Sequence, residues 1–242
     1  MKINVLGLKT DNLTMAEALS ETENRLAENA RTALVFTPNA EIAYACAKDD
    51  GLLSLVNSAD IVLPDGDGVL KAAKILGTPL KEKVAGVDYG MGVVSLCAAH
   101  GCGLYILGGK PDVAEAAAEN LKKSFPTLKI SGVHDGYFTK SGNESDTVAA
   151  EINSSGAKVL FVCLGFPAQE KWAKENLDKL SNVRLIACLG GSVDVYAGRI
   201  RRAPKLFIKC RLEWLWRLMR EPRRIGRMTA IPKYLSLAKK RK

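Results

Sequence analysis

Short apolar segments recur along the chain, and each ends in a turn of glycine, proline or polar residues that precedes a helical pattern. The apolar residues stand at consecutive positions, which is typical of strands buried on both faces in a parallel sheet covered by helices. Strands that alternate with helices predict an α/β protein with a Rossmann-like, mostly parallel sheet flanked by helices. The strand segments are ALVF at 33–36, DIVL at 60–63, LYIL at 104–107, VLFVC at 159–163 and RLIAC at 184–188.

This fold class predicts where a ligand binds. In an open parallel sheet, the turns beyond the carboxyl ends of the strands converge and form the binding crevice. The polar and glycine residues of those turns are therefore expected to lie together, although they are far apart in sequence. They are Thr37, Asn39, Asp65, Asp67, Gly108, Gly109, Gln169, Gly190, Gly191 and Asp194.

Several of these residues also have a purely structural interpretation. Thr37 and Asn39 precede a helical pattern and would serve as helix caps. Gly108 and Gly109 allow a tight turn, and equally their backbone N–H groups at a helix start suit a diphosphate. Gln169 is expected in a first helical turn, where solvent exposure is the default. The residue pattern alone leaves these alternatives open.

The stretch IVLPDGDGVL at 61–70 presents two aspartates on a glycine-rich turn directly after a strand. A catalytic base, a pair of metal ligands and a sharp turn are the three competing interpretations. A carboxylate close to a helix amino terminus is stabilised as the anion and accepts a proton from a bound hydroxyl group. A metal ion would need further oxygen ligands, which the nearby sequence does not supply. Asp65 is therefore predicted as a general base, ahead of a turn, and the metal role that Asp67 suggests comes last.

Positive charge is concentrated at the carboxyl end of the chain. Residues 199–242 hold 16 Lys and Arg against 2 acidic residues, whereas residues 1–198 hold 19 against 24. This contrast divides the chain into a Rossmann-like catalytic domain at 1–198 and a basic appendage at 199–242. Such an appendage favours a phosphate-bearing partner, which includes lipid headgroups, nucleic acid and phosphorylated substrates.

The cellular compartment is predicted from cysteine usage and from the apolar segments. The six cysteines are scattered without CxxC spacing, which argues against a metal cluster or a disulfide framework and favours a reducing compartment. The first residues do not resemble a signal peptide, and no apolar run approaches the ~18 residues of a spanning helix. We therefore expect a cytoplasmic protein.

The segment LFIKCRLEWLWRLM at 206–219 has apolar and basic residues at helical spacing. An amphipathic helix with tryptophans and arginines suits the surface of an anionic membrane, and this interpretation is favoured. The structural alternative is a terminal helix that docks its tryptophans on the body. A nucleic-acid-binding module that grips a phosphate backbone is the alternative from a different class. The segment is apolar as well as basic and no recognised nucleic-acid motif accompanies it, so no nucleic-acid partner is expected.

Motifs along the chain carry a resemblance to a known family. They are TPNAEI at 37–42, ADIVLPDGDGV at 59–69, KVAGVD at 83–88, LYILGG at 104–109, HDGYF at 134–138, GFPAQEKW at 165–172 and GGSVDVYAG at 190–198. Together with Arg-Ala-Pro and Glu-Pro-Arg-Arg in the appendage, they occur in the order of the WecG/TagA/CpsF glycosyltransferase family. The chain resembles that family from about residue 3 to about residue 228, and most closely its N-acetylmannosaminyltransferase branch.

The resemblance implies a reaction. Members of this branch transfer N-acetylmannosamine from UDP-N-acetylmannosamine to the 4-hydroxyl of N-acetylglucosamine on undecaprenyl diphosphate, in wall teichoic acid linkage-unit synthesis. The anomeric configuration inverts, and no metal or other cofactor is expected. A related UDP-hexose or N-acetylmannosaminuronic acid transferase is the alternative within the family. The implied partners are the sugar donor, the lipid-linked acceptor and the inner face of the membrane, with a homo-oligomer possible.

The resemblance also assigns roles to residues. Asp65 falls on the position of the catalytic base. Thr37, Asn39 and Gln169 match positions that bind sugar, and Tyr137 and Asp194 are weaker candidates for the nucleotide end.

The phosphate-binding positions include one departure from the family. Lys83 stands where the family commonly has Arg, which keeps the positive charge but loses the planar two-pronged grip on phosphate. Arg217, Arg224 and Arg227 match arginines that close over the diphosphate.

Overall fold

The structure is a computed structural model that describes residues 1–27, 31–201, 203–204, 207, 215–216, 219 and 225–241. Six parallel strands form one sheet in the order β4-β3-β8-β7-β5-β6, and β1 and β2 form a separate antiparallel hairpin. The strands are β1 (Lys2–Val5), β2 (Leu8–Asp11), β3 (Ala33–Phe36), β4 (Ile61–Val62), β5 (Gly103–Gly108), β6 (Lys129–His134), β7 (Val159–Cys163) and β8 (Leu185–Cys188).

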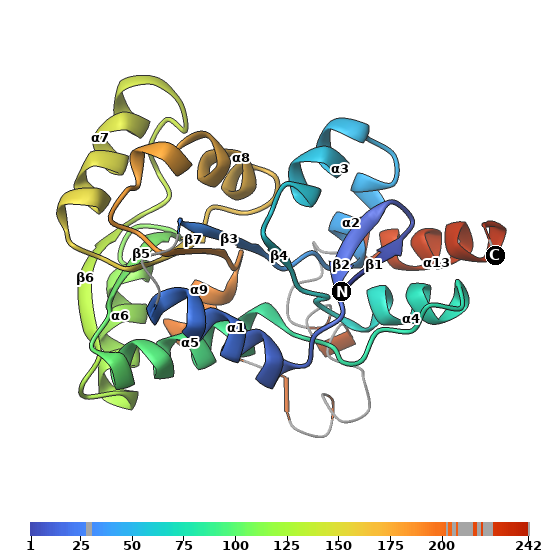
Figure 1. The fold of residues 1–242 in the computed structure, drawn as a ribbon, viewed down its shortest axis with the longest axis horizontal. Helices are drawn as coiled ribbons and strands as arrows, with labels where there is room; N and C mark the ends of the chain where they lie inside the picture. Colours follow the sequence, from blue (N-terminus) through green and yellow to red (C-terminus); the bar gives the residue numbers. More distant parts are fainter. Residues whose placement is uncertain are drawn as a thin grey trace.

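Helices cover both faces of the sheet (Figure 1). Helices α2, α3, α7 and α8 lie on one face, and α1, α5, α6 and α9 lie on the other. The helices are α1 (Met15–Ala27), α2 (Ala40–Cys46), α3 (Asp50–Asn57), α4 (Asp67–Ile75), α5 (Gly86–His100), α6 (Val113–Ser124), α7 (Gly142–Ser154), α8 (Ala168–Glu175), α9 (Ser192–Tyr196), α12 (Ile225–Met228) and α13 (Ala230–Lys240), with a 3-10 turn at Leu177–Lys179. The predicted α/β class and the flanked parallel sheet are confirmed.

Alternate residues of each central strand enter two separate cores. In β7, Leu160 and Val162 pack on the α8 face, whereas Val159 and Phe161 pack on the α5 face. Because both sets are buried, the strand carries apolar residues at every position, as the continuous runs in the sequence predict. The five expected strand segments all coincide with strands of the sheet.

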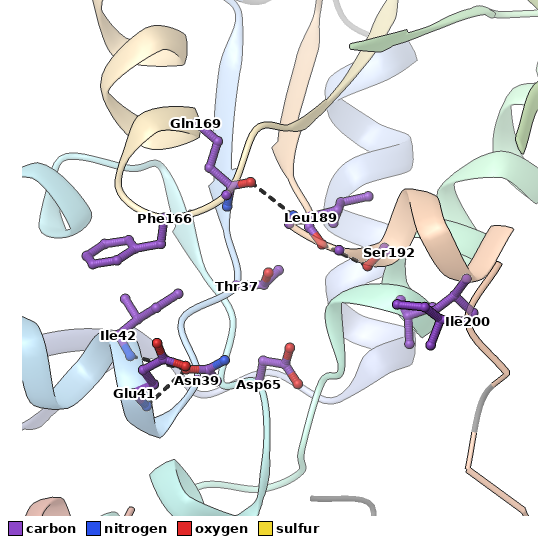
Figure 2. Close-up of a pocket in the computed structure, with 15 residues that line it drawn as sticks. Thr37, Asn39, Glu41, Ile42, Asp65, Phe166, Gln169, Leu189, Ser192 and Ile200 are labelled. Carbon is purple, nitrogen blue, oxygen red and sulfur yellow. Dashed lines mark hydrogen bonds between the residues drawn. The ribbon is translucent and has the colours of Figure 1, made fainter. Parts of the chain in front are cut away.

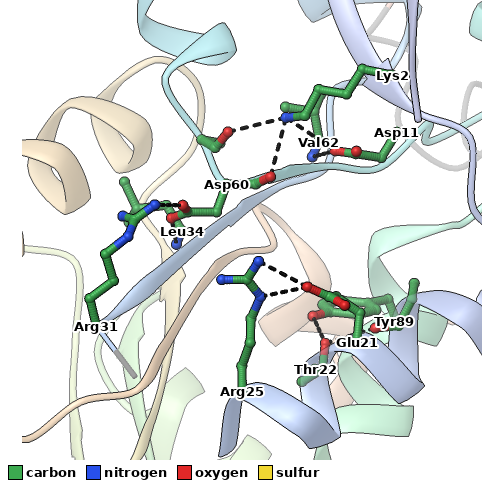
Figure 3. A network of polar contacts seen from close by, with 12 residues as sticks. Lys2, Asp11, Glu21, Thr22, Arg25, Arg31, Leu34, Asp60, Val62 and Tyr89 are labelled. Carbon is green, nitrogen blue, oxygen red and sulfur yellow. Dashed lines mark hydrogen bonds and ion pairs between the residues drawn. The ribbon is translucent and has the colours of Figure 1, made fainter. Parts of the chain in front are cut away.

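Strand β4 is a sheet edge of two residues, and a network of polar contacts joins it to the hairpin (Figure 3). The backbone N–H of Val62 donates to Asp11 Oδ2 over 2.9 Å, and Asp11 also pairs with Lys2 Nζ at 3.2 Å. Lys2 Nζ donates in turn to the carbonyl of Asp60 over 3.2 Å. The side chain of Asp60 accepts a hydrogen bond from the backbone N–H of Leu34 in β3 over 2.9 Å. These contacts satisfy an edge strand whose open side would otherwise present unpaired backbone groups.

The final helix of the chain packs on the body. Helix α13 lies against α2 and α4, with Tyr234 and Ala238 fully buried and Ile231 packed on the same core. Tyr234 Oη lies 3.5 Å from the carbonyl of Val5, its acceptor in β1. The described part of the appendage therefore includes a helix that contributes to the core, and the division of the chain at residue 198 stays a prediction.

Two predictions concern the membrane, namely the amphipathic helix at 206–219 and the absence of a spanning helix. Most of residues 206–219 lie outside the described residues, so the amphipathic helix predicted there stays a prediction. Within the part that the structure describes, no helix combines the length and apolar character needed to cross a bilayer.

We expect Asp11→Ala to lower the free energy of unfolding by about 1–3 kcal/mol, because the buried N–H of Val62 loses its acceptor. Asp11→Asn keeps an acceptor oxygen and loses only the partly exposed ion pair with Lys2, so its loss should stay below about 1 kcal/mol. Urea denaturation followed by circular dichroism measures both variants. Equal losses in the two variants would mean that the ion pair with Lys2, and not the hydrogen bond to Val62, accounts for the stability that Asp11 contributes.

Candidate active site

A cavity of about 260 Å³ opens at the carboxyl ends of β3, β4, β7 and β8 (Figure 2). It is smaller than the ~300–1,000 Å³ of sites for drug-sized ligands and mixes polar with apolar side chains. The lining residues are Thr37, Asn39, Glu41, Ile42, Asp65, Val87, Gly165, Phe166, Gln169, Leu189, Gly190, Gly191, Ser192, Val195 and Ile200. Six predicted residues from the ends of four different strands thus meet at one cavity: Thr37, Asn39, Asp65, Gln169, Gly190 and Gly191.

Thr37 and Asn39 follow β3 and serve the fold as well as the cavity. Thr37 Oγ1 donates to the carbonyl of Cys188 over 3.1 Å, which ties the ends of the neighbouring strands β3 and β8. Asn39 Oδ1 accepts the backbone N–H groups of Glu41 and Ile42 over 3.0 and 3.1 Å. Asn39 is therefore the cap of α2, as one of the two interpretations predicted, and the cap also fixes its side chain at the cavity wall.

Asp65 reaches the cavity from the end of β4. Its backbone N–H donates to the carbonyl of Pro38 over 3.2 Å, so the turn after β4 runs beside the turn after β3. Gly66 follows with a φ of +86°, a conformation that favours glycine, and α4 begins at Asp67. The turn interpretation thus holds for Gly66, while the carboxyl group of Asp65 faces the cavity near Asn39 and Thr37 (Figure 2).

Gln169 is 3% exposed, so the expectation of an exposed residue in the first turn of α8 is wrong. Its Oε1 accepts the backbone N–H of Gly190 over 3.0 Å, which is the dashed line at Gln169 in Figure 2. Its Nε2 donates to Glu170 Oε1 over 2.8 Å. The buried face of α8 continues through Trp172 and Ala173 at helical spacing, and this periodicity is the sequence signal that places Gln169 inward.

Glu170 is a buried carboxyl group behind the cavity wall. It is 2% exposed, and burial raises its pKa to about 7 despite the hydrogen bond from Gln169. The thiols of Cys46 and Cys188 lie within its electrostatic reach, and burial raises the pKa of both, that of Cys46 to about 12. Both thiols therefore stay neutral at physiological pH, and Glu170 is the member of this group that titrates near neutrality.

Asp67 and Lys83 lie next to each other, with Lys83 Nζ 3.8 Å from Asp67 Oδ2. Neither residue lines the cavity. Across the described residues, no three His, Cys, Asp or Glu side chains are grouped so that they would hold a metal ion. A substrate role for Lys83 stays a prediction.

Gly108 and Gly109 end β5 away from the cavity lining. The backbone N–H of Gly109 donates to the carbonyl of Cys163 over 3.2 Å, and a Cβ at Gly108 would lie 2.3 Å from the same oxygen. The close approach of β7 therefore requires glycine here, which supports the turn interpretation. Since α6 begins only at Val113, the N–H of Gly109 is not a helix-start group, and a diphosphate contact by these glycines stays a prediction.

The two residues predicted for the nucleotide end also lie outside the cavity lining. Tyr137 is 69% exposed in the segment after β6. Asp194 is in the first turn of α9, and its backbone carbonyl accepts the N–H groups of Arg199 and Ile200 over 2.9 and 3.1 Å. These bonds direct the chain past the cavity, where Ile200 contributes to the wall.

The three arginines of the appendage cannot be placed at the site. Arg217 and Arg224 lie outside the described residues, and only the backbone of Arg227, in α12, is described. Their predicted contact with a diphosphate stays a prediction.

Several lining residues were not predicted. Ser192 is one of them; its Oγ donates to the carbonyl of Leu189 over 2.8 Å, which shapes the turn after β8. The apolar lining residues, such as Phe166 and Val195, carry no chemical signal in the sequence that separates them from the core.

The cavity brings two carboxyl groups, two hydroxyl groups and two carboxamides to the carboxyl edge of a parallel sheet, which is where doubly wound α/β enzymes bind their ligands. The sequence matches the glycosyl transferase WecG/TagA/CpsF family over residues 3–242. The chain therefore belongs to the WecG/TagA/CpsF glycosyltransferase family and is a glycosyltransferase.

Three similar proteins share the name N-acetylglucosaminyldiphosphoundecaprenol N-acetyl-beta-D-mannosaminyltransferase. The relative from Bacillus spizizenii is 32% identical over 97% of this chain and 88% of its own length. The relative from Bacillus subtilis is 34% identical over 84% of this chain and 77% of its own length. The relative from Staphylococcus aureus is 30% identical over 97% of this chain and 91% of its own length.

The titration of Glu170 predicts a pH dependence of stability. Its pKa in the folded chain, about 7, lies above the unfolded value of 4.5, so its contribution to stability is full below pH 4.5 and is lost as the pH rises towards 7. The loss is of the order of 3 kcal/mol. Glu170→Gln does not titrate, so its free energy of unfolding relative to the wild type should rise between pH 4.5 and 7.5, measured by urea denaturation. Parallel pH profiles for the two proteins would contradict this assignment.

Proposed function

We propose that this glycosyltransferase moves N-acetylmannosamine from UDP-N-acetylmannosamine to the 4-hydroxyl of N-acetylglucosamine on undecaprenyl diphosphate, with inversion at the anomeric carbon. The reaction belongs to the synthesis of the wall teichoic acid linkage unit. The activity that names the three relatives supports the choice of sugar and acceptor. The observation that carries the proposal is the carboxyl group of Asp65 at a cavity whose other polar groups are neutral hydrogen-bonding side chains and Glu41.

Asp65 acts as the general base in this proposal. The acceptor hydroxyl gives its proton to the Asp65 carboxylate, while its oxygen attacks the anomeric carbon of the donor from the face opposite the diphosphate. The bond from that carbon to the diphosphate oxygen breaks, and UDP leaves with the electron pair. The hydrogen bond from the Asp65 N–H to the carbonyl of Pro38 holds the backbone that carries the base, which supports a fixed geometry for proton transfer.

Thr37, Asn39 and Gln169 contact the sugars in this proposal. Hydroxyl and carboxamide groups both donate and accept hydrogen bonds, so they suit the hydroxyl and acetamido groups of amino sugars. Each of the three side chains already has a hydrogen bond to the protein backbone. The site is thus organised before a ligand binds, which lowers the cost of ordering it.

Positive side chains neutralise the departing diphosphate. We assign this role to Lys83 and to Arg217, Arg224 and Arg227, with the nucleotide contacted by Gly108, Gly109, Tyr137 and Asp194. Guanidinium groups stabilise growing negative charge on a phosphate without a metal ion. The basic appendage at 199–242 also brings the enzyme to the anionic inner face of the membrane, where the acceptor lipid resides.

Replacing the base tests the reaction directly. We expect Asp65→Asn to lower kcat for transfer at least about a hundredfold, because a carboxamide cannot accept the proton. Asp49→Asn is the matched control, since Asn replaces Asp equally well as the cap of α3 and the position is remote from the cavity. Turnover is measured with a synthetic N-acetylglucosamine-diphosphate-lipid acceptor. Wild-type turnover in Asp65→Asn would remove Asp65 from the mechanism.

A donor screen tests the substrate. UDP-N-acetylmannosamine should be used at least about tenfold more efficiently than UDP-N-acetylglucosamine or UDP-N-acetylmannosaminuronic acid, judged by kcat/KM. A chelator should leave the rate unchanged. Preference for the uronic acid would instead assign the chain to another surface-polysaccharide pathway of the family.

Membrane association is tested separately by vesicle flotation of the full chain. The protein should float with phosphatidylglycerol-containing vesicles, remain behind with phosphatidylcholine alone, and be released by high salt, which screens the basic residues. Tight binding to a single-stranded oligonucleotide at physiological salt, with no vesicle binding, would overturn the membrane role.

A further inference from the structure

The oxygen and the nitrogen of the Gln169 carboxamide each have a hydrogen-bond partner, and both hydrogen bonds require the same orientation of the amide. Its oxygen receives the backbone N–H of Gly190 over 3.0 Å, and its nitrogen donates to Glu170 Oε1 over 2.8 Å. The Gly190 N–H can only donate, and Glu170 Oε1 accepts whether the carboxyl group is ionised or carries its proton on Oε2, so a flipped amide would face a donor with its nitrogen and an acceptor with its oxygen. The two partners together therefore select one of the two flip states.

Glu170 is not itself part of the cavity. Its side chain is buried between α8 and the sheet, near Cys188 of β8 and Cys46 of α2, and it does not line the cavity. Among the described residues, its second oxygen, Oε2, has no hydrogen-bond partner. A carboxyl group in this position is unfavourable for folding, since a buried polar atom without a partner costs stability. A role in stability alone therefore does not account for it.

The same contacts connect two elements of the site. Glu170 and Gln169 belong to α8, and Gly190 belongs to the turn after β8, which lines the cavity with Gly191. With Nε2 bound to Glu170 and Oε1 bound to Gly190, the amide keeps one N–H and one lone pair for a ligand. The orientation of the amide thus decides which edge of a sugar it donates to and which it accepts from.

We propose that Glu170 is a positioning residue that fixes the amide of Gln169 in the orientation required to bind a sugar in the cavity. This inference rests on the proposed function, because it concerns the transfer reaction. It adds a residue that touches no substrate and acts through Gln169.

Two substitutions separate positioning from packing. Glu170→Leu has a similar volume but no acceptor, so it should lower kcat/KM about tenfold or more, the scale expected when a binding group is displaced. It also removes a buried carboxyl group, so its midpoint of urea unfolding at pH 7 should equal or exceed that of the wild type. Glu170→Gln keeps an acceptor oxygen for Nε2 of Gln169, so both contacts of the amide persist and its kcat/KM should stay within about threefold of the wild type.

A double-mutant cycle tests whether Glu170 acts through its neighbour. In a Gln169→Ala background, Glu170→Leu should change kcat/KM less than about twofold, because the group that it positions is absent. Wild-type kcat/KM in Glu170→Leu, or an equal loss in both backgrounds, would overturn the proposal.

The controls keep this test distinct from the test of the proposed function. If Gln169→Ala transfers sugar like the wild type, the positioning role is overturned while the assignment of Asp65 is unaffected. If the wild-type chain transfers no sugar from any UDP donor, the proposed function fails first, before any variant of Glu170 is compared, and the inference falls with it.

Discussion

The site depends on the register of the parallel strands. Their carboxyl ends must be aligned for the residues that follow them to line one cavity. The register of β4 is held by the shortest pairing, because β4 pairs with β3 through only two residues. Backbone hydrogen bonds extend the pairing beyond the strand, from Leu63 N–H to the Phe36 carbonyl over 2.8 Å and from Asp65 N–H to the Pro38 carbonyl over 3.2 Å. A slip by one residue would turn the side chains of this segment to the opposite face of the sheet. The hairpin contact at Asp11 therefore bears on the position of Asp65 as well as on stability.

The sequence predicts the central sheet well because its strands are buried on both faces. The runs at 159–163 and 184–188 have few alternatives to a covered parallel strand, and the structure confirms them. Strand β6 was not predicted, because Lys129–His134 includes Ser131 and Gly132 and is only partly buried at the sheet edge. The hairpin of β1 and β2 was also missed, since its strands have four residues each and pack on the end of the sheet.

The site is predictable where the fold class alone brings residues together. Thr37, Asn39, Asp65 and Gln169 follow strands β3, β4 and β7, so the topology gathers them without knowledge of side-chain contacts. Glu170 could not be found in this way, because the role proposed for it depends on a buried hydrogen bond and not on a position at a strand end. The role of Gly109 could not be predicted either, because a turn glycine has the same sequence signature whether it binds a ligand or accommodates a neighbouring strand.

The packing of α13 changes how the basic appendage should be understood. Ile200 borders the cavity, and α13 is seated between α2 and α4, the helices that start beside Asn39 and Asp65. The described residues on both sides of the arginine-rich stretch therefore lie against the body. A group fused to the carboxyl end of the chain would therefore follow a helix that packs on the two helices beginning next to Asn39 and Asp65.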